Sequence, residues 1–192
     1  MKRWPPLFAL FLAAGTGCLR PSPPVTYYTL EPLRLEAIAQ RPIALEVLPV
    51  RLPDLLMRPQ MVVAGASGAL ELSGTHRWGN PLDQDMRRVL VDDLGRLLGS
   101  DAVVASPLGA RVAAAYRLEV DVDVCAARPG SGLRLEAVWI VTRPGAAQAL
   151  LVRRAALREA LPDSGPAALA AAHSRILAAL AREIAGELVK LP

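Results

Sequence analysis

The segment from Tyr116 to Val124 alternates strictly between apolar and charged side chains, and this pattern constrains the fold more than any other feature of the chain. Successive side chains of a strand point to opposite faces of a sheet, so the segment is predicted to be a strand with one buried face and one solvated face. Such half-solvated strands are typical of antiparallel sheets. Two further strands are expected at 133–142 and 149–157, each after a turn rich in glycine and proline. The three segments together predict an antiparallel meander.

Two amphipathic helices are predicted, one before and one after this meander. Asn80 can cap the first helix, Pro81 suits its first turn, and Gly99 suits its end. The second helix is expected to span about 167–190. Apolar residues recur at helical spacing along one side of each helix, so each helix has an apolar stripe that must be buried against another layer.

The remaining strands are short. They are predicted at 25–30 and 43–47, with a hairpin that joins 60–64 to 69–72. The expected fold class is therefore α+β: a single domain, residues 25–192, with a mainly antiparallel sheet and two amphipathic helices packed on one face.

The first residues have the layout of a secretory signal peptide. A positively charged start is followed by an apolar run of eight from Leu7 to Ala14, and small residues lead up to Cys18. This layout predicts that 1–17 is a lipoprotein signal peptide, that Cys18 carries the lipid, and that 18–24 is a proline-rich tether. Leu19 after the cysteine favours sorting to the outer membrane. An ordinary signal peptide with an incidental cysteine stays open as an alternative.

Composition excludes several classes of protein. No apolar run reaches the roughly 20 residues of a membrane-spanning helix, which excludes a polytopic membrane protein. The formal net charge of +4 falls by two when Lys2 and Arg3 leave with the signal peptide, and no basic run remains, so no nucleic-acid partner is expected. Two cysteines and two histidines offer few ligands, and we predict no metal and no cofactor.

A row of carboxylates is the most visible group of titratable residues. Glu119, Asp121 and Asp123 share one face of a predicted strand, where paired carboxylates can perform acid–base chemistry or bind a metal. The alternative, which we favour, is a solvated face with Arg117 on it and Arg134 or Arg154 of a neighbouring strand across from it.

Few other residues are candidates for catalysis. A hydrolase would have to use Ser67 or His76, which are both expected in loops, and neither has an evident partner. Cys125 is expected on the polar side of its strand, Asp93 as an ordinary helix charge, and His173 as a packing or surface residue of the last helix. We therefore predict that the protein is not an enzyme.

Three segments carry a more specific signal: Tyr27 to Leu30, Leu52 to Val62, and Arg77 to Leu82. In this order and spacing they resemble the PqiC/YmbA-like lipoproteins, the auxiliary lipoprotein components of ABC-type intermembrane transport systems, over nearly the whole mature chain. The resemblance implies a non-catalytic lipoprotein that is anchored in the outer membrane and faces the periplasm. It also implies a partner with mammalian-cell-entry (MCE) domains, which moves lipids or other hydrophobic compounds between the two membranes. The alternative function is an assembly or structural lipoprotein of another envelope machine, such as lipopolysaccharide export or efflux.

The loop between Pro53 and Pro59 contains three consecutive apolar residues, which either pack under the sheet or form an exposed contact for a partner protein or lipid. Arg58 and Arg77 are expected to pair with Asp54 or with helix acids, and Trp78 is expected to pack at the start of the first helix. The candidate partner-contact residues are Leu55, Leu56, Met57, Arg58, Gln60, Arg77, Trp78, Val138 and Ile140.

The outer face of the meander is expected to be polar at one end and apolar at the other. Val138, Ile140, Leu150 and Val152, or their neighbours of opposite parity, form the apolar end. A monomer seldom exposes a contiguous apolar patch of several hundred Å², so we predict that the protein is a homo-oligomer.

Overall fold

The computed structural model describes residues 23–39, 42–64, 69–107, 113–128, 130–146, 148–163 and 165–192. The strands are β1 (Thr26–Tyr28), β2 (Leu45–Val47), β3 (Gln60–Ala64), β4 (Leu70–Trp78), β5 (Val103–Ala105), β6 (Tyr116–Arg128), β7 (Gly132–Thr142) and β8 (Ala149–Glu159). The helices are the short 3-10 helix η1 (Asp54–Met57) and the α-helices α1 (Leu82–Leu97) and α2 (Pro166–Leu188). No helix in these ranges is long and apolar enough to cross a membrane.

A five-stranded sheet with the order β5-β2-β6-β7-β8 contains the predicted meander. Both β6–β7 and β7–β8 are antiparallel, as expected from the two turns. At the other edge, β2 runs parallel to both β5 and β6. The sheet is therefore mixed, and β5, which sequence patterns did not predict, completes it.

A separate three-stranded sheet has the order β1-β4-β3. The predicted β3–β4 hairpin is confirmed, and β1 adds to it in parallel. The strand β4 extends to Trp78, so the expectation that His76 lies in a loop is wrong. Pairing with β1 on one side and β3 on the other satisfies this backbone and keeps it extended.

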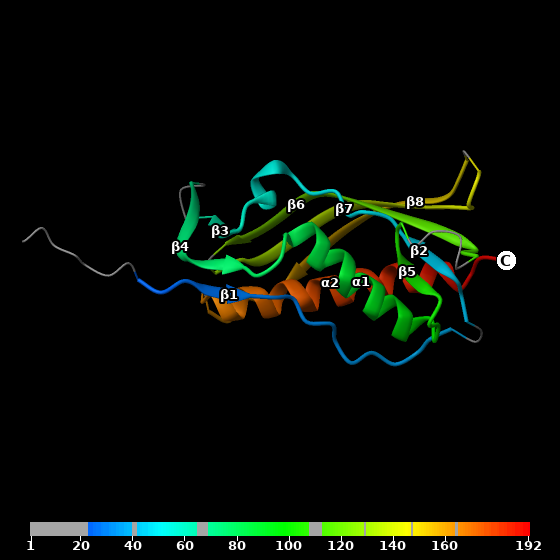
Figure 1. Ribbon diagram of the computed structural model, residues 1–192, viewed down its shortest axis with the longest axis horizontal. Helices are drawn as coiled ribbons and strands as arrows, with labels where there is room; N and C mark the ends of the chain where they lie inside the picture. The colour runs from blue at the N-terminus through cyan, green and yellow to red at the C-terminus, as the bar shows by residue number, and fades with distance from the viewer. Residues whose placement is uncertain are drawn as a thin grey trace, which may run out of the picture.

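Both α-helices pack on the same face of the five-stranded sheet, which confirms the α+β arrangement (Figure 1). Every residue of the apolar stripe of α1 is buried, and Gly99, with φ of +57°, ends the helical segment as expected. The predicted cap is wrong: Asn80 makes no capping bond and instead donates to the Asp85 carboxylate at 3.4 Å. The large indole of Trp139, fully buried, lies at the centre of the core.

A register shift in β6 between Val122 and Val124 changes which side chains face the core. Before it the predicted alternation holds, with Val120 and Val122 buried. After it the parity inverts, so Cys125 is buried rather than on the polar side as expected. Burial raises the pKa of this thiol to about 12, which keeps it protonated and unreactive.

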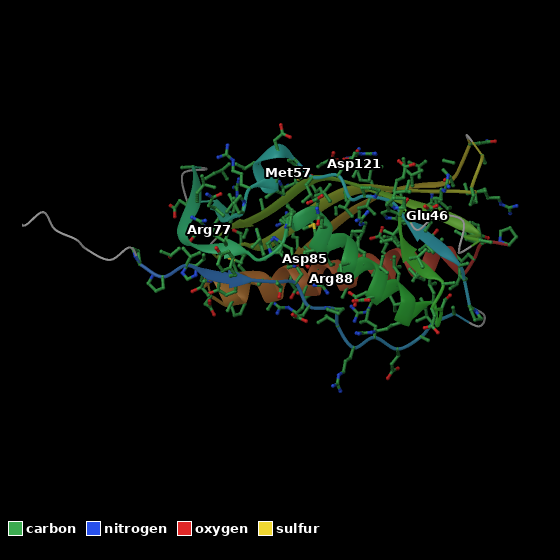
Figure 2. All side chains as sticks on the ribbon, viewed as in Figure 1. Glu46, Met57, Arg77, Asp85, Arg88 and Asp121 are labelled. Carbon is green, nitrogen blue, oxygen red and sulfur yellow. The ribbon has the colours of Figure 1, made fainter. Side chains whose placement is uncertain are left out.

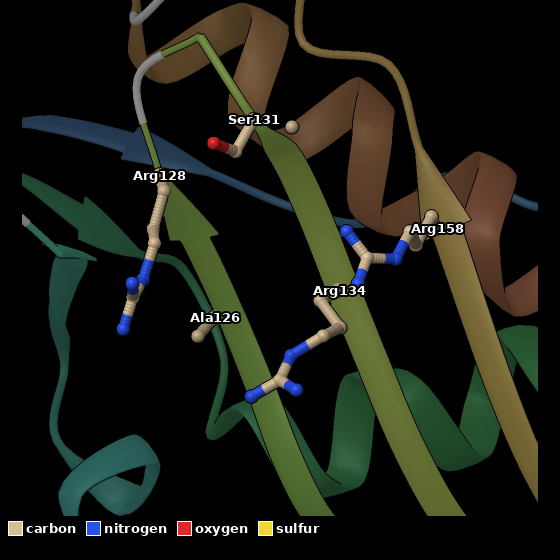
Figure 3. A pocket seen from close by; sticks show the side chains of 6 residues that line it. Ala126, Arg128, Ser131, Arg134 and Arg158 are labelled. Atoms are coloured by element: carbon tan, nitrogen blue, oxygen red, sulfur yellow. The ribbon is translucent and has the colours of Figure 1, made fainter.

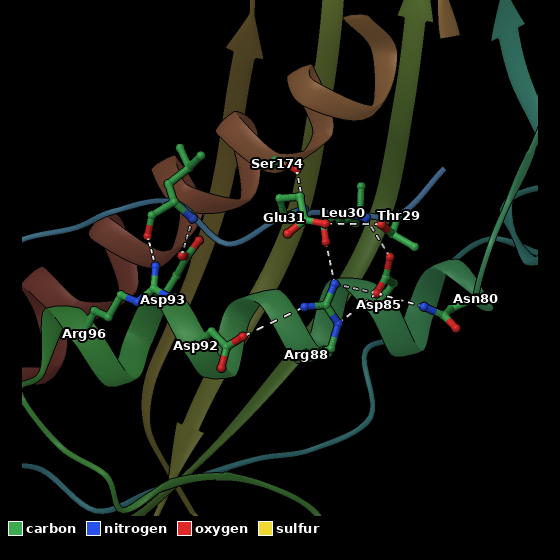
Figure 4. Close-up of polar contacts among 11 residues, drawn as sticks. Thr29, Leu30, Glu31, Asn80, Asp85, Arg88, Asp92, Asp93, Arg96 and Ser174 are labelled. Carbon is green, nitrogen blue, oxygen red and sulfur yellow. Dashed lines mark hydrogen bonds and ion pairs between the residues drawn. The ribbon is translucent and has the colours of Figure 1, made fainter. Parts of the chain in front are cut away.

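Residues 29–39, which we call the strap, cross α1 and α2 on the side away from the sheet (Figure 1). The strap has no regular structure, so side chains of the helices satisfy its backbone. The amides of Leu30 and Glu31 donate to Asp85 at 2.8 Å and to Ser174 at 2.9 Å (Figure 4). The strap thus fastens the N-terminal part of the domain to both helices.

Candidate partner interface

The three-stranded sheet brings together the three sequence segments that carry the family resemblance. Tyr28 of β1 is the register partner of Trp78 in β4, and Gln60 of β3 is the partner of Arg77. The Trp78 amide also donates to the Pro59 carbonyl at 2.7 Å. Segments separated by up to 50 positions in sequence therefore form one small unit.

Trp78 is a packing residue, as expected. It is 6% exposed, and its ring meets the edge of the His173 ring with centroids 5.1 Å apart and planes at 71°. The imidazole of His173 is itself buried, with Nδ1 2.8 Å from the Leu169 carbonyl. Burial lowers the pKa of His173 to about 4, so the ring is neutral at physiological pH and Nδ1–H donates to that carbonyl.

The expected ion pairs of Arg58 and Arg77 are wrong. Neither guanidinium lies within 4 Å of Asp54 or of an acid of α1, and Asp85, a buried acid of that helix, is already paired with Arg88 at 2.8 Å. Arg77 has a buried Nε with no hydrogen-bond partner among the described residues. A buried donor of this kind is costly to leave unpaired, so Arg77 keeps an unused capacity to bind an acceptor.

The apolar residues of the 53–59 loop divide between the two expected placements. They lie on η1, where Leu56 packs against the core and Leu55 is half-buried. Met57 is 50% exposed and lies on the side of the molecule away from the helices (Figure 2). Arg58 is exposed beside it, and Gln60 is half-buried. The exposed contact that η1 offers is therefore Met57 with Arg58.

The carboxylate row is a solvated face neutralised by arginines, as we favoured. Of the arginines named for this role only Arg154 fills it, because Arg117 pairs with Glu46 at 2.7 Å and Arg134 with Glu136 at 2.8 Å. Arg51 bridges two of the acids, with Nε 3.0 Å from Asp121 and Nη2 3.6 Å from Glu119. The hydrogen bond to Asp121 raises the pKa of Arg51. Arg154 pairs with Asp123 at 3.2 Å. Exposed pairs of this kind contribute little stability, and the row forms a solvated face.

The apolar patch, which we define as Val138, Ile140, Leu150 and Val152, lies on the outer face of β7 and β8. Ile140 and Val152 are direct cross-strand partners. Val152 is 54% exposed and Leu150 40% exposed, whereas Val138 and Ile140 are partly buried. Across the next strand pair, Val138 faces Asp121 and Ile140 faces Glu119. An apolar patch with a charged border is the usual anatomy of a protein contact surface.

Of the two residues considered for a hydrolase, only His76 belongs to the described part of the chain. Ser67 and the predicted lipid-bearing Cys18 fall outside the described residues. His76 lies in β4 with Nδ1 3.2 Å from the Tyr28 hydroxyl. In the described part of the chain, no group of three or more His, Cys, Asp or Glu side chains is arranged to hold a metal ion.

Sequence patterns missed the two buried acids of α1. Asp85 accepts hydrogen bonds from the Leu30 amide and from Arg88, and Arg88 in turn donates to the Leu30 carbonyl (Figure 4). We call this pair the Asp85–Arg88 clamp. Asp93 accepts from the Leu33 amide at 3.0 Å. The spacing of Asp85 and Arg88 along the helix was visible in the sequence, but nothing local identifies the strap amides as their partners.

Two crystal structures resemble the fold. One is of an uncharacterized protein, with a TM-score of 0.67 and 22% identity over 86% of this chain and 99% of the other. The second is of a Xanthomonas campestris protein of the DUF330 family, with a TM-score of 0.70 and 18% identity over 86% of this chain and 95% of the other. These identities establish similarity of fold alone. No curated protein matches the chain significantly in sequence.

A family model gives the assignment. The model described as the ABC-type transport auxiliary lipoprotein component matches residues 28–185, from β1 to the last turn of α2. This match covers the three segments on which the resemblance was noted except for Tyr27, together with the strap, α1 and most of α2. The chain therefore belongs to the family of ABC-type transport auxiliary lipoprotein components.

Proposed function

We propose that the protein is a non-catalytic adaptor lipoprotein, held in the outer membrane by Cys18, that serves an MCE-type ABC system for intermembrane transport of lipids or other hydrophobic compounds. The family match, which names a lipoprotein component of ABC-type transport, is the observation that carries this proposal. The signal-peptide layout that ends at Cys18 supports the anchor, and Leu19 supports the outer membrane.

The state of the titratable groups favours an adaptor over a hydrolase. His173 and Cys125 are buried, the imidazole neutral and the thiol protonated. His76 is engaged by the Tyr28 hydroxyl, and the acids of β6 are engaged by arginines. Among the described residues, no serine, threonine or cysteine side chain is hydrogen-bonded to a histidine ring, as an activated nucleophile of a hydrolase would be.

Two surfaces are proposed for protein contacts. Met57 at the end of η1 and Arg58 directly after it form the surface for the MCE-domain partner. The apolar patch on β7 and β8 forms the contact between identical copies, so the adaptor is a homo-oligomer.

Co-purification with the MCE-domain protein from detergent-solubilised membranes tests the partner. We expect the wild-type protein to retain this partner and Met57→Glu to lose most of it, because a charge at the centre of an apolar contact must be desolvated. Leu70→Glu is the matched control, since Leu70 on β4 is also 50% exposed. A reproducible absence of the partner from the wild-type sample contradicts the proposal.

The anchor is tested by Cys18→Ser. Without the thiol, the protein should lose acylation and remain unprocessed or become soluble. Membrane fractionation with mass spectrometry of the N-terminal peptide measures both effects. A variant that is still acylated and still sediments with the outer membrane shows that the lipid is attached elsewhere.

A further inference from the structure

A pocket lined by three arginines lies at the end of the five-stranded sheet where β6 turns into β7. Its volume is about 250 Å³, and we call it the arginine pocket. Three strands supply its guanidinium groups, which surround the opening on the outer face of the meander (Figure 3). Its lining residues are Ala126, Arg128, Ser131, Gly132, Arg134 and Arg158.

The arrangement of these arginines is unfavourable in the absence of an anion. Arg134 and Arg158 are direct cross-strand partners, and like charges at such positions repel one another. The neighbour of Arg134 on the other side is Ala126, which contributes no charge. Arg128, at the last position of β6, adds a third positive charge at the rim.

The acids near the pocket do not balance this charge. Glu136 pairs with Arg134 at 2.8 Å, and Glu159 at the end of β8 is engaged by Arg175 of α2 at 2.5 Å. Arg128 and Arg158 have no ion pair within the described residues. The pocket therefore carries an excess of positive charge, together with the hydroxyl of Ser131 as a further hydrogen-bond donor.

We propose that the arginine pocket binds a phosphate group, carried either by the headgroup of an anionic membrane lipid or by a free phosphate. Guanidinium groups bind phosphate through paired, charge-assisted hydrogen bonds. The oxygens of one phosphate group can accept from more than one guanidinium, so a pocket lined by three arginines suits this ligand. The site goes beyond the proposed adaptor function and does not depend on an MCE-domain partner.

The position of the pocket favours a lipid as the source. The β6–β7 turn lies at the same end of the molecule as Pro23, where the described chain begins (Figure 1). If Cys18 holds the tether in the membrane, as proposed above, this end of the domain faces the headgroups. The basic surface then meets the anionic lipids of the leaflet.

Isothermal titration calorimetry of the full chain in dodecyl maltoside tests the site in two arms. One arm titrates inorganic phosphate, and the other titrates mixed micelles that contain phosphatidylglycerol. We expect saturable binding in at least one arm, and Arg158→Gln should weaken it by about tenfold or more through loss of one charged, bidentate donor. The affinity of Arg158→Lys should lie between those of the wild type and Arg158→Gln, because lysine keeps the positive charge but lacks the planar, bidentate guanidinium group.

The matched control is Arg143→Gln, which removes the same charge from an exposed position in the β7–β8 turn at the other end of the sheet. This variant should bind as the wild type does. Binding of phosphatidylglycerol alone identifies a lipid headgroup as the ligand, and binding of inorganic phosphate alone identifies the free anion. Absence of binding in both arms, or an equal loss in Arg143→Gln and Arg158→Gln, overturns the proposal.

Discussion

Asp93 is a carboxyl group that the fold places in an apolar environment. It is fully buried, its Oδ1 accepts from the Leu33 amide, and its Oδ2 has no hydrogen-bond partner among the described residues. Burial raises the pKa of Asp93 to about 6, and the hydrogen bond from Leu33 opposes this effect only in part. The folded protein therefore holds this proton more tightly than the unfolded chain does, and the charged form of Asp93 destabilises the fold.

The sign of the pH dependence follows from this difference. Between the unfolded pKa of about 4 and the folded pKa of about 6, the folded state binds more protons, so this group's contribution to stability falls as pH rises. We expect Asp93→Asn to raise the free energy of unfolding by about 1–3 kcal/mol at pH 7.5 and to have no such effect near pH 4. Urea denaturation of both proteins across this range measures the difference. An advantage that is constant with pH contradicts the assignment to Asp93.

At the scale of elements, the strap pairs with no strand, and side chains of the two helices bind its first half. The amides of Ile38 and Ala39, at its other end, donate to the Leu97 carbonyl of α1. The carboxylate of Asp85 is 2% exposed and accepts from the Leu30 amide and from Arg88. Removal of one member of such a buried pair leaves the other polar groups unsatisfied. Docking of the first part of the strap therefore depends on the Asp85 carboxylate.

We expect Asp85→Ala to lower the free energy of unfolding by about 2–4 kcal/mol and to expose the strap amides. Denaturant unfolding gives the energy, and hydrogen exchange at Leu30 and Glu31 reports the strap itself. The control is Asp92→Ala, because Asp92 is 46% exposed and its ion pair with Arg88 is long, at 3.9 Å. This variant should change the free energy of unfolding by less than about 0.5 kcal/mol. If the Leu30 and Glu31 amides of Asp85→Ala exchange as slowly as those of the wild type, the strap does not depend on Asp85.

The elements show which parts of the fold the sequence predicted. The meander and both helices have strong local periodicity, and each was predicted within a few residues of its observed bounds. The strand β5 is three residues long and pairs in parallel with the distant β2, so no local pattern identifies it. The inversion of parity at Cys125 depends on an extra residue in the ladder, which leaves no signature in the alternation that precedes it.

Prediction of the candidate site is limited in the same way, because contacts between distant segments leave no local pattern in the sequence. Trp78 was predicted as a packing residue because large aromatic side chains dominate cores, and it is buried against His173. The partners of Arg58 and Arg77 were predicted wrongly, because Asp85 is occupied by a strap residue and an arginine that only the tertiary fold brings there. The candidate contacts on the outer face remain predictions until a partner is captured.

At the scale of the whole molecule, the outer face of β7 and β8 differs between its two ends. The apolar patch lies beside the β7–β8 turn, and the arginine pocket lies beside the β6–β7 turn. This agrees with the expectation of one apolar end and one polar end. Self-association through the apolar patch would leave the arginine pocket open at the opposite end.

Light scattering of residues 19–192 tests self-association. We expect a mass above that of one copy at high concentration, and we expect Ile140→Glu or Val152→Glu to shift it to a monomer, because each places a charge in the apolar contact. Leu72→Glu on β4 is the control for Val152→Glu, with 46% against 54% exposure. If the wild-type protein is a strict monomer and Ile140→Glu does not change its mass, the protein does not self-associate. The apolar patch could then contact only a different protein.

The parallel pairing of β1 with β4 determines how the domain bears mechanical load. The described chain enters at one end of the long axis and runs inward along β1, so a pull outward on Pro23 acts along the strand (Figure 1). Hydrogen bonds between β1 and β4 are then strained in shear and share the force, instead of opening one after another as in a zipper. The strap and the Asp85–Arg88 clamp lie next along the load path. A domain connected in this way passes a pull on Pro23 through β1 and the strap to both helices.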